Sequence, residues 1–347
     1  MAGRVDGTRA WAHWRLRWPA EAAPRRARAN TRLAPTAWYN VAVARFEAAY
    51  LKLGSAALAE RVRQAREMLR DCHVCPHNCA VDRSAGERGV CRVGDVAVVS
   101  SYGPHFGEEA PLVGVGGSGT IFLTHCNLRC VFCQNADISQ GGVGRETSSD
   151  ELAAMMLALQ RQGCHNINFV SPTHHVPMIL AGVEAAAANG LRVPLVYNTG
   201  GYDAVPTLRL LDGVFDIYMP DAKYSDNEIA RRYSGAPDYW DRNREALREM
   251  HRQAGDLQMD ERGIARRGLL VRHLVLPGDL AGTRAVMQFL AALSRDTYVN
   301  VMAQYRPCHR ALDYEELSRR PTAQEYQQAV QWALDAGIHR LDERPFR

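Results

Sequence analysis

Three cysteines within one short segment are the side chains of this sequence best suited to chemistry. Cys126, Cys130 and Cys133 are separated by three and then by two residues. Three thiolates at such spacing can bind three irons of a cubane iron–sulfur cluster and leave the fourth iron without a protein ligand. An open coordination position is where a metal site binds its substrate. The spacing therefore predicts a catalytic iron–sulfur centre.

Two other interpretations of the triplet stay open on the residues alone. His125 could complete a zinc knuckle with the cysteines, and cysteines also occur as packed, inert thiols. We favour the cluster because the aromatic Phe132 precedes the last cysteine and an apolar, strand-like segment, residues 120–124, leads into the loop. Enzymes of the α/β class place their sites on loops that leave the carboxyl ends of strands.

At these residues the sequence resembles the radical S-adenosylmethionine (SAM) superfamily, whose signature is three cysteines at this spacing with an aromatic residue before the last. The resemblance implies a 4Fe–4S cluster on Cys126, Cys130 and Cys133, with SAM bound at the open iron. It further implies reductive cleavage of SAM to methionine and a 5′-deoxyadenosyl radical, which abstracts hydrogen from a substrate. Family geometry places Phe132 near the adenine of SAM.

From Cys72 almost to its end, the chain is similar to an uncharacterised, pyruvate formate-lyase activating enzyme-like family of that superfamily. The segments that carry this similarity are Cys72-His-Val-Cys75-Pro, 103–109, Cys133-Gln-Asn, Ser171-Pro-Thr-His174, 216–221 and 272–277. It implies an oxidoreductase, a low-potential electron donor of the flavodoxin or ferredoxin type and, as the leading hypothesis, a glycyl radical enzyme as the activated partner. Radical modification of a small molecule or peptide, and a non-catalytic iron–sulfur electron carrier, are the alternatives.

The elements that must position these residues alternate between strand and helix from residue 120 onward. Strands are expected at 120–124, 166–171, 193–197, 214–219, 269–276 and 297–304, and helices near 148–162, 175–189, 203–211, 239–254, 282–294 and 322–336. Such alternation implies a parallel sheet with right-handed crossovers. The predicted fold class is α/β, a partial (β/α)6 barrel of the radical SAM type with an N-terminal helical and cysteine-rich extension.

Charged residues end the fourth and fifth strands. Asp221 and Lys223 follow the fourth strand, and Lys223 is one of only two lysines in the chain. Activators of glycyl radical proteins carry a similar Asp-x-Lys near the cofactor, so we predict that both residues are catalytic; the alternative is an exposed ion pair of little energetic value. Arg272 and His273 alternate on the fifth strand, so at most one of them points into the barrel.

Polar residues at the ends of the second and third strands are the predicted SAM contacts. The family holds the methionyl amino group of SAM near the end of the second strand, where this chain offers Ser171 and Thr173. Asn198 ends the third strand and suits a ribose or substrate contact. The adjacent His174 and His175 either face the substrate or cap the following helix.

Four further cysteines precede the triplet, at positions Cys72, Cys75, Cys79 and Cys91. Four thiols can close a site with no open position, and thiolates suit both tetrahedral zinc and an iron–sulfur cluster. We therefore predict a second metal site in a cysteine-rich module, residues 72–110, with a short strand near 96–100. Cys164 and Cys308 are expected to be ordinary buried thiols.

The remaining features bound the class of protein. Residues 1–71 form a basic extension that is irregular over 1–37 and contains two helices over 38–70; the barrel is assigned to 111–347. We favour a solvated, arginine-rich extension over a nucleic-acid-binding arm. Neither a membrane span nor a secretion signal is evident. We therefore expect a cytoplasmic protein whose cysteines serve metal or redox chemistry.

Overall fold

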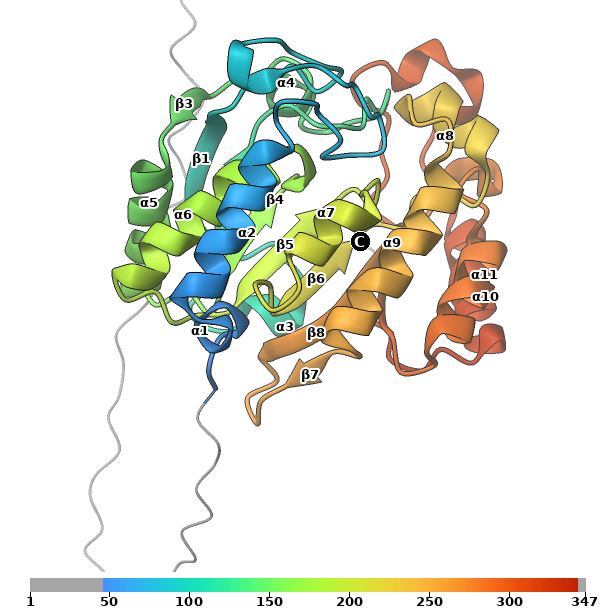
Figure 1. The fold of residues 1–347 in the computed structure, drawn as a ribbon. Helices are drawn as coiled ribbons and strands as arrows, with labels where there is room; N and C mark the ends of the chain where they lie inside the picture. Colours follow the sequence, from blue (N-terminus) through green and yellow to red (C-terminus); the bar gives the residue numbers. More distant parts are fainter. Residues whose placement is uncertain (1–45, 343–347) are drawn as a thin grey trace, which may run out of the picture. The chain divides into compact units, whose positions relative to one another are not determined.

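Parallel strands that follow one another in chain order form the centre of the fold (Figure 1). They are β2 (Ser118–Leu123), β4 (Ile167–Val170), β5 (Leu195–Thr199), β6 (Ile217–Pro220), β8 (Ala265–Leu274) and β9 (Tyr298–Met302). Each pairs in parallel with the next. The computed structural model describes residues 46–342, and the predictions for residues 1–45 lie outside them.

Helices connect these strands and cover the outer face of the sheet. They are α5 (Ser149–Arg161), α6 (Val176–Ala188), α7 (Val205–Leu210), α9 (Tyr239–Ala254), α10 (Thr283–Leu293) and α11 (Ala323–Ala336). The start of α5 is fixed by a capping box, in which Ser148 Oγ accepts the Glu151 amide at 3.2 Å and the Glu151 carboxylate accepts the Ser148 amide at 2.8 Å. The predicted strand–helix alternation is confirmed.

Antiparallel strands extend both edges of the sheet. They are β1 (Ala97–His105), which pairs with β2, β3 (Arg145–Thr147), which pairs with β1, and β7 (Gln258–Met259), which pairs with β8. Among the described residues β1 and β9 do not pair, so the barrel is partial, as predicted.

The strand predicted near 96–100 is longer than expected and belongs to the barrel sheet. It runs to His105 through Gly103 and Pro104. Beyond Val99 no strand pairs with its outer edge within residues 46–342, and such an edge tolerates proline.

Alternation along the strands separates two apolar layers. On the outer face, buried side chains such as Ile121, Phe169 and Tyr197 pack against the helices and form the largest hydrophobic cluster. On the inner face the neighbouring residues Phe122, Val170 and Asn198 point into the barrel. The inner face therefore carries the side chains that can meet a ligand.

The connection between β1 and β2 closes the floor of the barrel. It contains the short helix α3 (Ala110–Val113), whose Leu112 packs among interior side chains of β5, β6 and β8. The Leu112 carbonyl accepts a hydrogen bond from Asn166 Nδ2 at 2.9 Å. On the other side, Glu109 Oε1 accepts one from Asn300 Nδ2 at 2.8 Å. These contacts leave the strand carboxyl ends as the accessible mouth.

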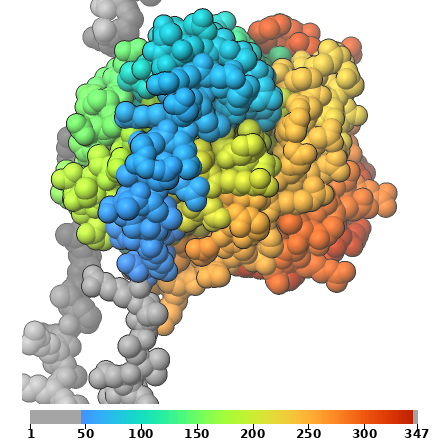
Figure 2. Space-filling view, viewed as in Figure 1, coloured from blue at the N-terminus to red at the C-terminus, as the bar shows by residue number. Residues whose placement is uncertain are grey.

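Two helices precede the cysteine-rich segment, in agreement with the sequence prediction for the described part of residues 38–70. They are α1 (Ala49–Leu53) and α2 (Ser55–Glu67), and α2 packs on α6 and α7. Figure 2 shows this blue segment lying over the yellow-green helices and rising into the cysteine-rich loop. Within residues 46–342, none of the helices has the length and apolar character required to cross a bilayer.

Candidate active site

The triplet lies on the loop that leaves the carboxyl end of β2 and enters the short helix α4 (Ala136–Ser139). The Cys126 amide donates to the Ser139 carbonyl at 2.8 Å, which folds the loop back on α4. The Val131 amide donates to the Tyr233 carbonyl, also at 2.8 Å, in α8 (Asn227–Ser234). The loop is therefore held by two elements that are distant from each other in sequence.

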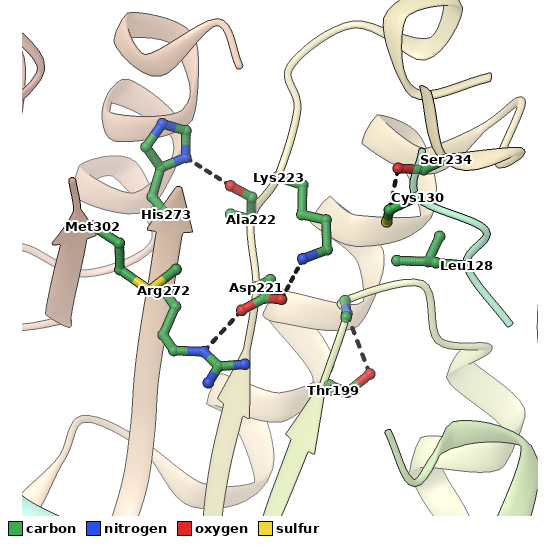
Figure 3. A network of polar contacts seen from close by, with 12 residues as sticks. Leu128, Cys130, Thr199, Asp221, Ala222, Lys223, Ser234, Arg272, His273 and Met302 are labelled. Atoms are coloured by element: carbon green, nitrogen blue, oxygen red, sulfur yellow. Dashed lines mark hydrogen bonds and ion pairs between the residues drawn. The ribbon is translucent and has the colours of Figure 1, made fainter. Parts of the chain in front are cut away.

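Each thiol of the triplet has a hydrogen-bond partner. The Leu128 amide donates to Cys126 Sγ at 3.4 Å, and Ser234 Oγ donates to Cys130 Sγ at 3.0 Å (Figure 3). The Ser139 hydroxyl lies 3.1 Å from Cys133 Sγ. Hydrogen bonds to sulfur stabilise metal-bound thiolates and tune cluster potentials. The donor set fits an iron–sulfur cluster.

The three thiols face a cavity of about 140 Å³ at the barrel mouth. The other side chains on its wall include Phe122, Leu128, Ile138, Val170, Ser171, Asn198, Asp221, Lys223 and Arg272. A larger hollow of about 860 Å³ lies between α2, β3 and α5, but no cysteine lines it. The chemistry of the lining, rather than its size, identifies the smaller cavity as the site.

A chain of charged groups crosses the wall opposite the thiols. Asp221 accepts from Lys223 Nζ at 2.5 Å and from Arg272 Nε at 2.8 Å. Arg272 Nη2 also donates to Asn198 Oδ1 at 2.7 Å. Figure 3 shows Asp221 between its two cationic partners, at the ends of neighbouring strands. The predicted residues Asp221, Lys223 and Asn198 are thus brought together by Arg272.

Their contacts show which of Arg272 and His273, neighbours on β8, points into the barrel. His273 points to the outer layer, where it hydrogen-bonds with the Ala222 carbonyl at 2.6 Å and with Thr283 Oγ1 at 2.9 Å. Ala222 lies between Asp221 and Lys223, so His273 supports the charged strand end from behind (Figure 3). Arg272 is therefore a site residue and His273 a positioning residue.

Electrostatics keep the pair in the cavity ionised. Burial would raise the pKa of Asp221, but Arg272 and Lys223 outweigh it and hold that pKa below its ordinary value. Burial would lower the pKa of Lys223, but the Asp221 carboxylate and, to a smaller extent, Cys130 raise it instead. The side chains are only 11% and 17% exposed. The alternative of an exposed surface pair is thereby excluded, and Lys223 presents an ammonium group beside the thiols.

In contrast to the Asp221–Lys223 pair, the thiols are kept in their neutral form by burial when no metal is bound. Burial raises the pKa of Cys126 to about 12, with added repulsion from Cys130 and relief from Lys223. A bare thiol here would stay protonated at neutral pH, whereas a bound metal deprotonates its thiol ligands. The loop is consequently suited to cysteines that are ligands rather than free nucleophiles.

Two of the predicted cofactor contacts lie away from the cavity. Thr173 is buried and donates to Asp203 Oδ1 at 2.7 Å, in a network that sequence analysis missed because Asp203 stands outside the recognised motifs. Phe132 packs edge-on against Tyr305, with ring centroids 5.6 Å apart. In contrast, Ser171 lines the cavity and has a left-handed φ of 57°.

The histidine pair is also turned away from the substrate side. Both rings are buried, and His174 Nε2 donates to the Thr124 carbonyl at 3.1 Å while His175 Nε2 accepts the Val98 amide at 3.3 Å. Burial lowers the pKa of His174 to about 3. The hypothesis that these histidines face the substrate is therefore wrong; they belong to the packing between β1, β2 and α6.

The other functional contacts missed by sequence analysis come from residues without a local motif. Ser139 and Ser234 approach the thiols from α4 and from the end of α8. Ser139 follows the triplet closely and could have been suspected from its position. Ser234 lies more than 100 residues beyond Cys130, so only the folded structure reveals it.

The four N-terminal cysteines lie on the loop between α2 and β1. Their thiols are free, and Cys72, Cys75 and Cys91 are buried while Cys79 is half-buried. Among residues 46–342, no three His, Cys, Asp or Glu side chains converge as ligands of one metal ion. The same is true of the triplet, whose thiols would each bind a different iron. A metal at the N-terminal cysteines stays a prediction.

Comparison with known sequences identifies a matching family and a relative that covers most of the chain. The sequence profile of the radical SAM superfamily matches residues 120–279. The uncharacterized protein MJ0674 of Methanocaldococcus jannaschii is 33% identical over 282 residues, which cover 79% of this chain and 77% of that protein. The matched superfamily region spans β2 to the end of β8 and includes the triplet, Asp221, Lys223 and Arg272.

The solved structures that are similar to this chain include TsrM and HydG. One is TsrM from Kitasatospora setae, a radical SAM methyltransferase, with a TM-score of 0.46, 15% identity, and coverage of 65% of this chain and 54% of that one. The other is HydG, a maturase of the [FeFe]-hydrogenase, with a TM-score of 0.43, 12% identity, and coverage of 83% and 63%. This chain therefore spans about half the length of TsrM.

Proposed function

This chain belongs to the radical SAM superfamily, with a 4Fe–4S cluster and SAM as cofactors, and we propose that it is an enzyme that generates a 5′-deoxyadenosyl radical for hydrogen abstraction. The observation that carries the proposal is the cavity in which three hydrogen-bonded thiols face the Asp221–Lys223 pair. When bound, the reduced cluster supplies the electron that cleaves SAM.

The protein's own residues hold and orient the reactants. Cys126, Cys130 and Cys133 would bind the cluster, and the Lys223 ammonium would attract the carboxylate of SAM as a compact charge. Asp221 fixes the direction of Lys223 and Arg272 by accepting from both. The apolar side chains on the cavity wall keep water from the radical.

We further propose that the substrate is a backbone glycine in a partner enzyme, and that a flavodoxin- or ferredoxin-type protein donates the electron. Support comes from the Asp221-Ala-Lys223 sequence at the end of β6 and from its position beside the thiols. The reaction would move a glycine hydrogen to the 5′ carbon and leave a glycyl radical on the partner.

Reduction of anaerobically reconstituted protein in the presence of SAM tests the radical chemistry. We expect 5′-deoxyadenosine and methionine in equal amounts, and a change in the electron paramagnetic resonance (EPR) spectrum of the cluster when SAM is added. An iron–sulfur electron carrier would be reduced without forming either product.

A labelling experiment tests the substrate. A candidate glycyl radical protein carrying α-deuterated glycine should transfer deuterium to 5′-deoxyadenosine and acquire a glycyl EPR signal. Deuterium that arrives instead from a labelled peptide or small molecule would replace the glycyl proposal and leave the radical chemistry intact.

A further inference from the structure

We propose that Cys72, Cys75, Cys79 and Cys91 bind a second iron–sulfur cluster, fully ligated by protein, beside the radical SAM loop. The cysteine-rich loop is defined here as the segment from Cys72 to Cys91. Its cysteines are free thiols within a loop whose backbone is folded tightly on itself. Four thiolates are the complete ligand set of a cubane cluster.

Hydrogen bonds of the loop backbone bring three of the four cysteines, Cys72, Cys79 and Cys91, close to one another. The Cys72 amide donates to the Val81 carbonyl at 3.1 Å and the Ala80 amide donates to the Cys72 carbonyl at 3.2 Å, which places Cys79 beside Cys72. The Val90 amide donates to Cys79 Sγ at 3.4 Å, which places Cys91 at the same point. Three segments of the loop therefore converge.

Close packing around Cys79 indicates that its position is specified. A Cβ atom on Gly89 would lie 2.6 Å from Cys79 Sγ, so only glycine permits this approach. Hydrogen bonds to sulfur, such as the one from the Val90 amide, stabilise metal-bound thiolates and tune cluster potentials. The turn brings backbone to the sulfur, as a cluster site requires.

A buried cation provides an independent argument for thiolates at this place. The side chain of Arg83 is 1% exposed, and it donates to the Gly94 and His174 carbonyls. Arg83 forms no ion pair with a carboxylate in the described chain, and its Nη1 lies 3.9 Å from Cys72 Sγ. A buried guanidinium without a counter-charge is costly. Metal-bound thiolates would supply that charge.

The arrangement favours a cluster over zinc. A zinc ion draws four sulfurs to a single point about 2.3 Å away from each. Among the described residues, no three His, Cys, Asp or Glu side chains form such a group, at either cysteine loop. A cubane cluster does not require it, because each thiolate binds a different iron.

The proposed cluster would adjoin the catalytic loop. His77 Nε2 donates to the Asn127 carbonyl at 2.7 Å, next to Cys126, and the His77 ring packs edge-on against Tyr202. With four protein ligands the second cluster has no open iron for SAM. Its EPR signal should therefore not respond to SAM.

Metal analysis of anaerobically reconstituted variants tests this proposal without using activity. Wild-type protein should contain about eight irons and eight sulfides per chain. The variant with Cys126, Cys130 and Cys133 replaced by Ala should keep about four of each, and a reduced EPR signal that SAM does not change. The matched control, Cys164→Ala, removes a buried thiol outside both loops and should keep the wild-type iron content.

The complementary variant separates this proposal from the proposed function. Replacing Cys72, Cys75, Cys79 and Cys91 by Ala should leave about four irons and the SAM-sensitive signal. If that variant fails to fold, the iron content of the first variant still decides the question. Zinc, or no metal, in the first variant would overturn the proposed second cluster. A wild-type protein that contains both clusters but whose EPR spectrum does not change when SAM is added would instead overturn the proposed function.

Discussion

The catalytic loop, with Cys126, Cys130 and Cys133, and the cysteine-rich loop contact each other through His77 and Asn127, yet they place their thiols in different surroundings. Around the catalytic loop, two serine hydroxyls and one backbone amide contact the sulfur atoms, and a cavity separates the thiols from Asp221, Lys223 and Arg272. Around the cysteine-rich loop, backbone amides and one buried arginine take these roles, and none of its cysteines lines the cavity.

This difference explains why a count of cysteines does not identify an active site. A reactive centre needs an open position and charged groups that can hold a substrate there. A closed centre needs only ligands and a balanced charge. The surroundings of the sulfur atoms, which come from distant parts of the chain, distinguish the two.

The largest difference between the loops should appear when one cysteine is removed from each of them in turn. Cys130→Ala should abolish 5′-deoxyadenosine formation, because the cluster loses one of three ligands. Cys79→Ala, the matched change in the other loop, should keep cleavage within about tenfold of wild type. Equal loss of product in both variants would mean that the two loops do not differ in function.

Loss of the cavity cation should have the next largest effect. Lys223→Ala should lower 5′-deoxyadenosine formation about a hundredfold, because the ammonium group acts on charged reactants in a buried site. Iron content should stay unchanged, since Lys223 is not a ligand. Lys223→Arg should restore only part of the rate, because a planar guanidinium does not reproduce a compact ammonium.

The other lysine provides the control for this change. Lys52 lies exposed on α1, and Lys52→Ala should have wild-type activity. A Lys223→Ala variant that keeps wild-type turnover at limiting SAM would remove Lys223 from the site.

The sequence predicts the barrel well, and it singles out the three-cysteine loop, because both depend on local patterns. The strand–helix alternation and the Cys-x3-Cys-x2-Cys spacing are readable within short windows, and the Asp221-Ala-Lys223 motif is equally local. The roles of Thr173 and His174 were misjudged for the same reason. Their position after β4 suggested the cavity, but both side chains are buried and form hydrogen bonds with Asp203 and the Thr124 carbonyl.

Contacts that depend on distant segments could not be predicted. Ser234 reaches Cys130 only after the chain has passed through α8, and Glu109 meets Asn300 across the barrel floor. A single sequence contains no pattern that links such positions. These residues therefore provide the sharpest tests of the structure.

Removing a hydroxyl donor should have a moderate effect confined to the catalytic loop. Ser234→Ala removes the hydrogen bond to Cys130 Sγ, which should make the cluster harder to reduce and slow SAM cleavage about tenfold. Redox titration followed by EPR measures the shift. Ser225→Ala is a matched change in the segment before α8, outside the cavity lining, and should leave the potential unchanged.

The smallest effect concerns the buried histidines that support each region, His273 behind the catalytic strand end and His174 beside Arg83. Burial lowers the pKa of His273 to about 4 and that of His174 to about 3. Between an unfolded pKa of about 6.5 and these values, the unfolded chain binds more protons than the folded one, so stability falls as the pH falls. Each histidine should therefore lower the free energy of unfolding by about 1.4 kcal/mol for every pH unit between its unfolded and its folded pKa.

Urea unfolding of His273→Asn and His174→Asn should each show a shallower pH dependence than wild type between pH values of about 6 and 5. Below a pH of about 4 only the His174 difference should continue to grow, and parallel curves for wild type and both variants would show that neither imidazole is held neutral by the fold.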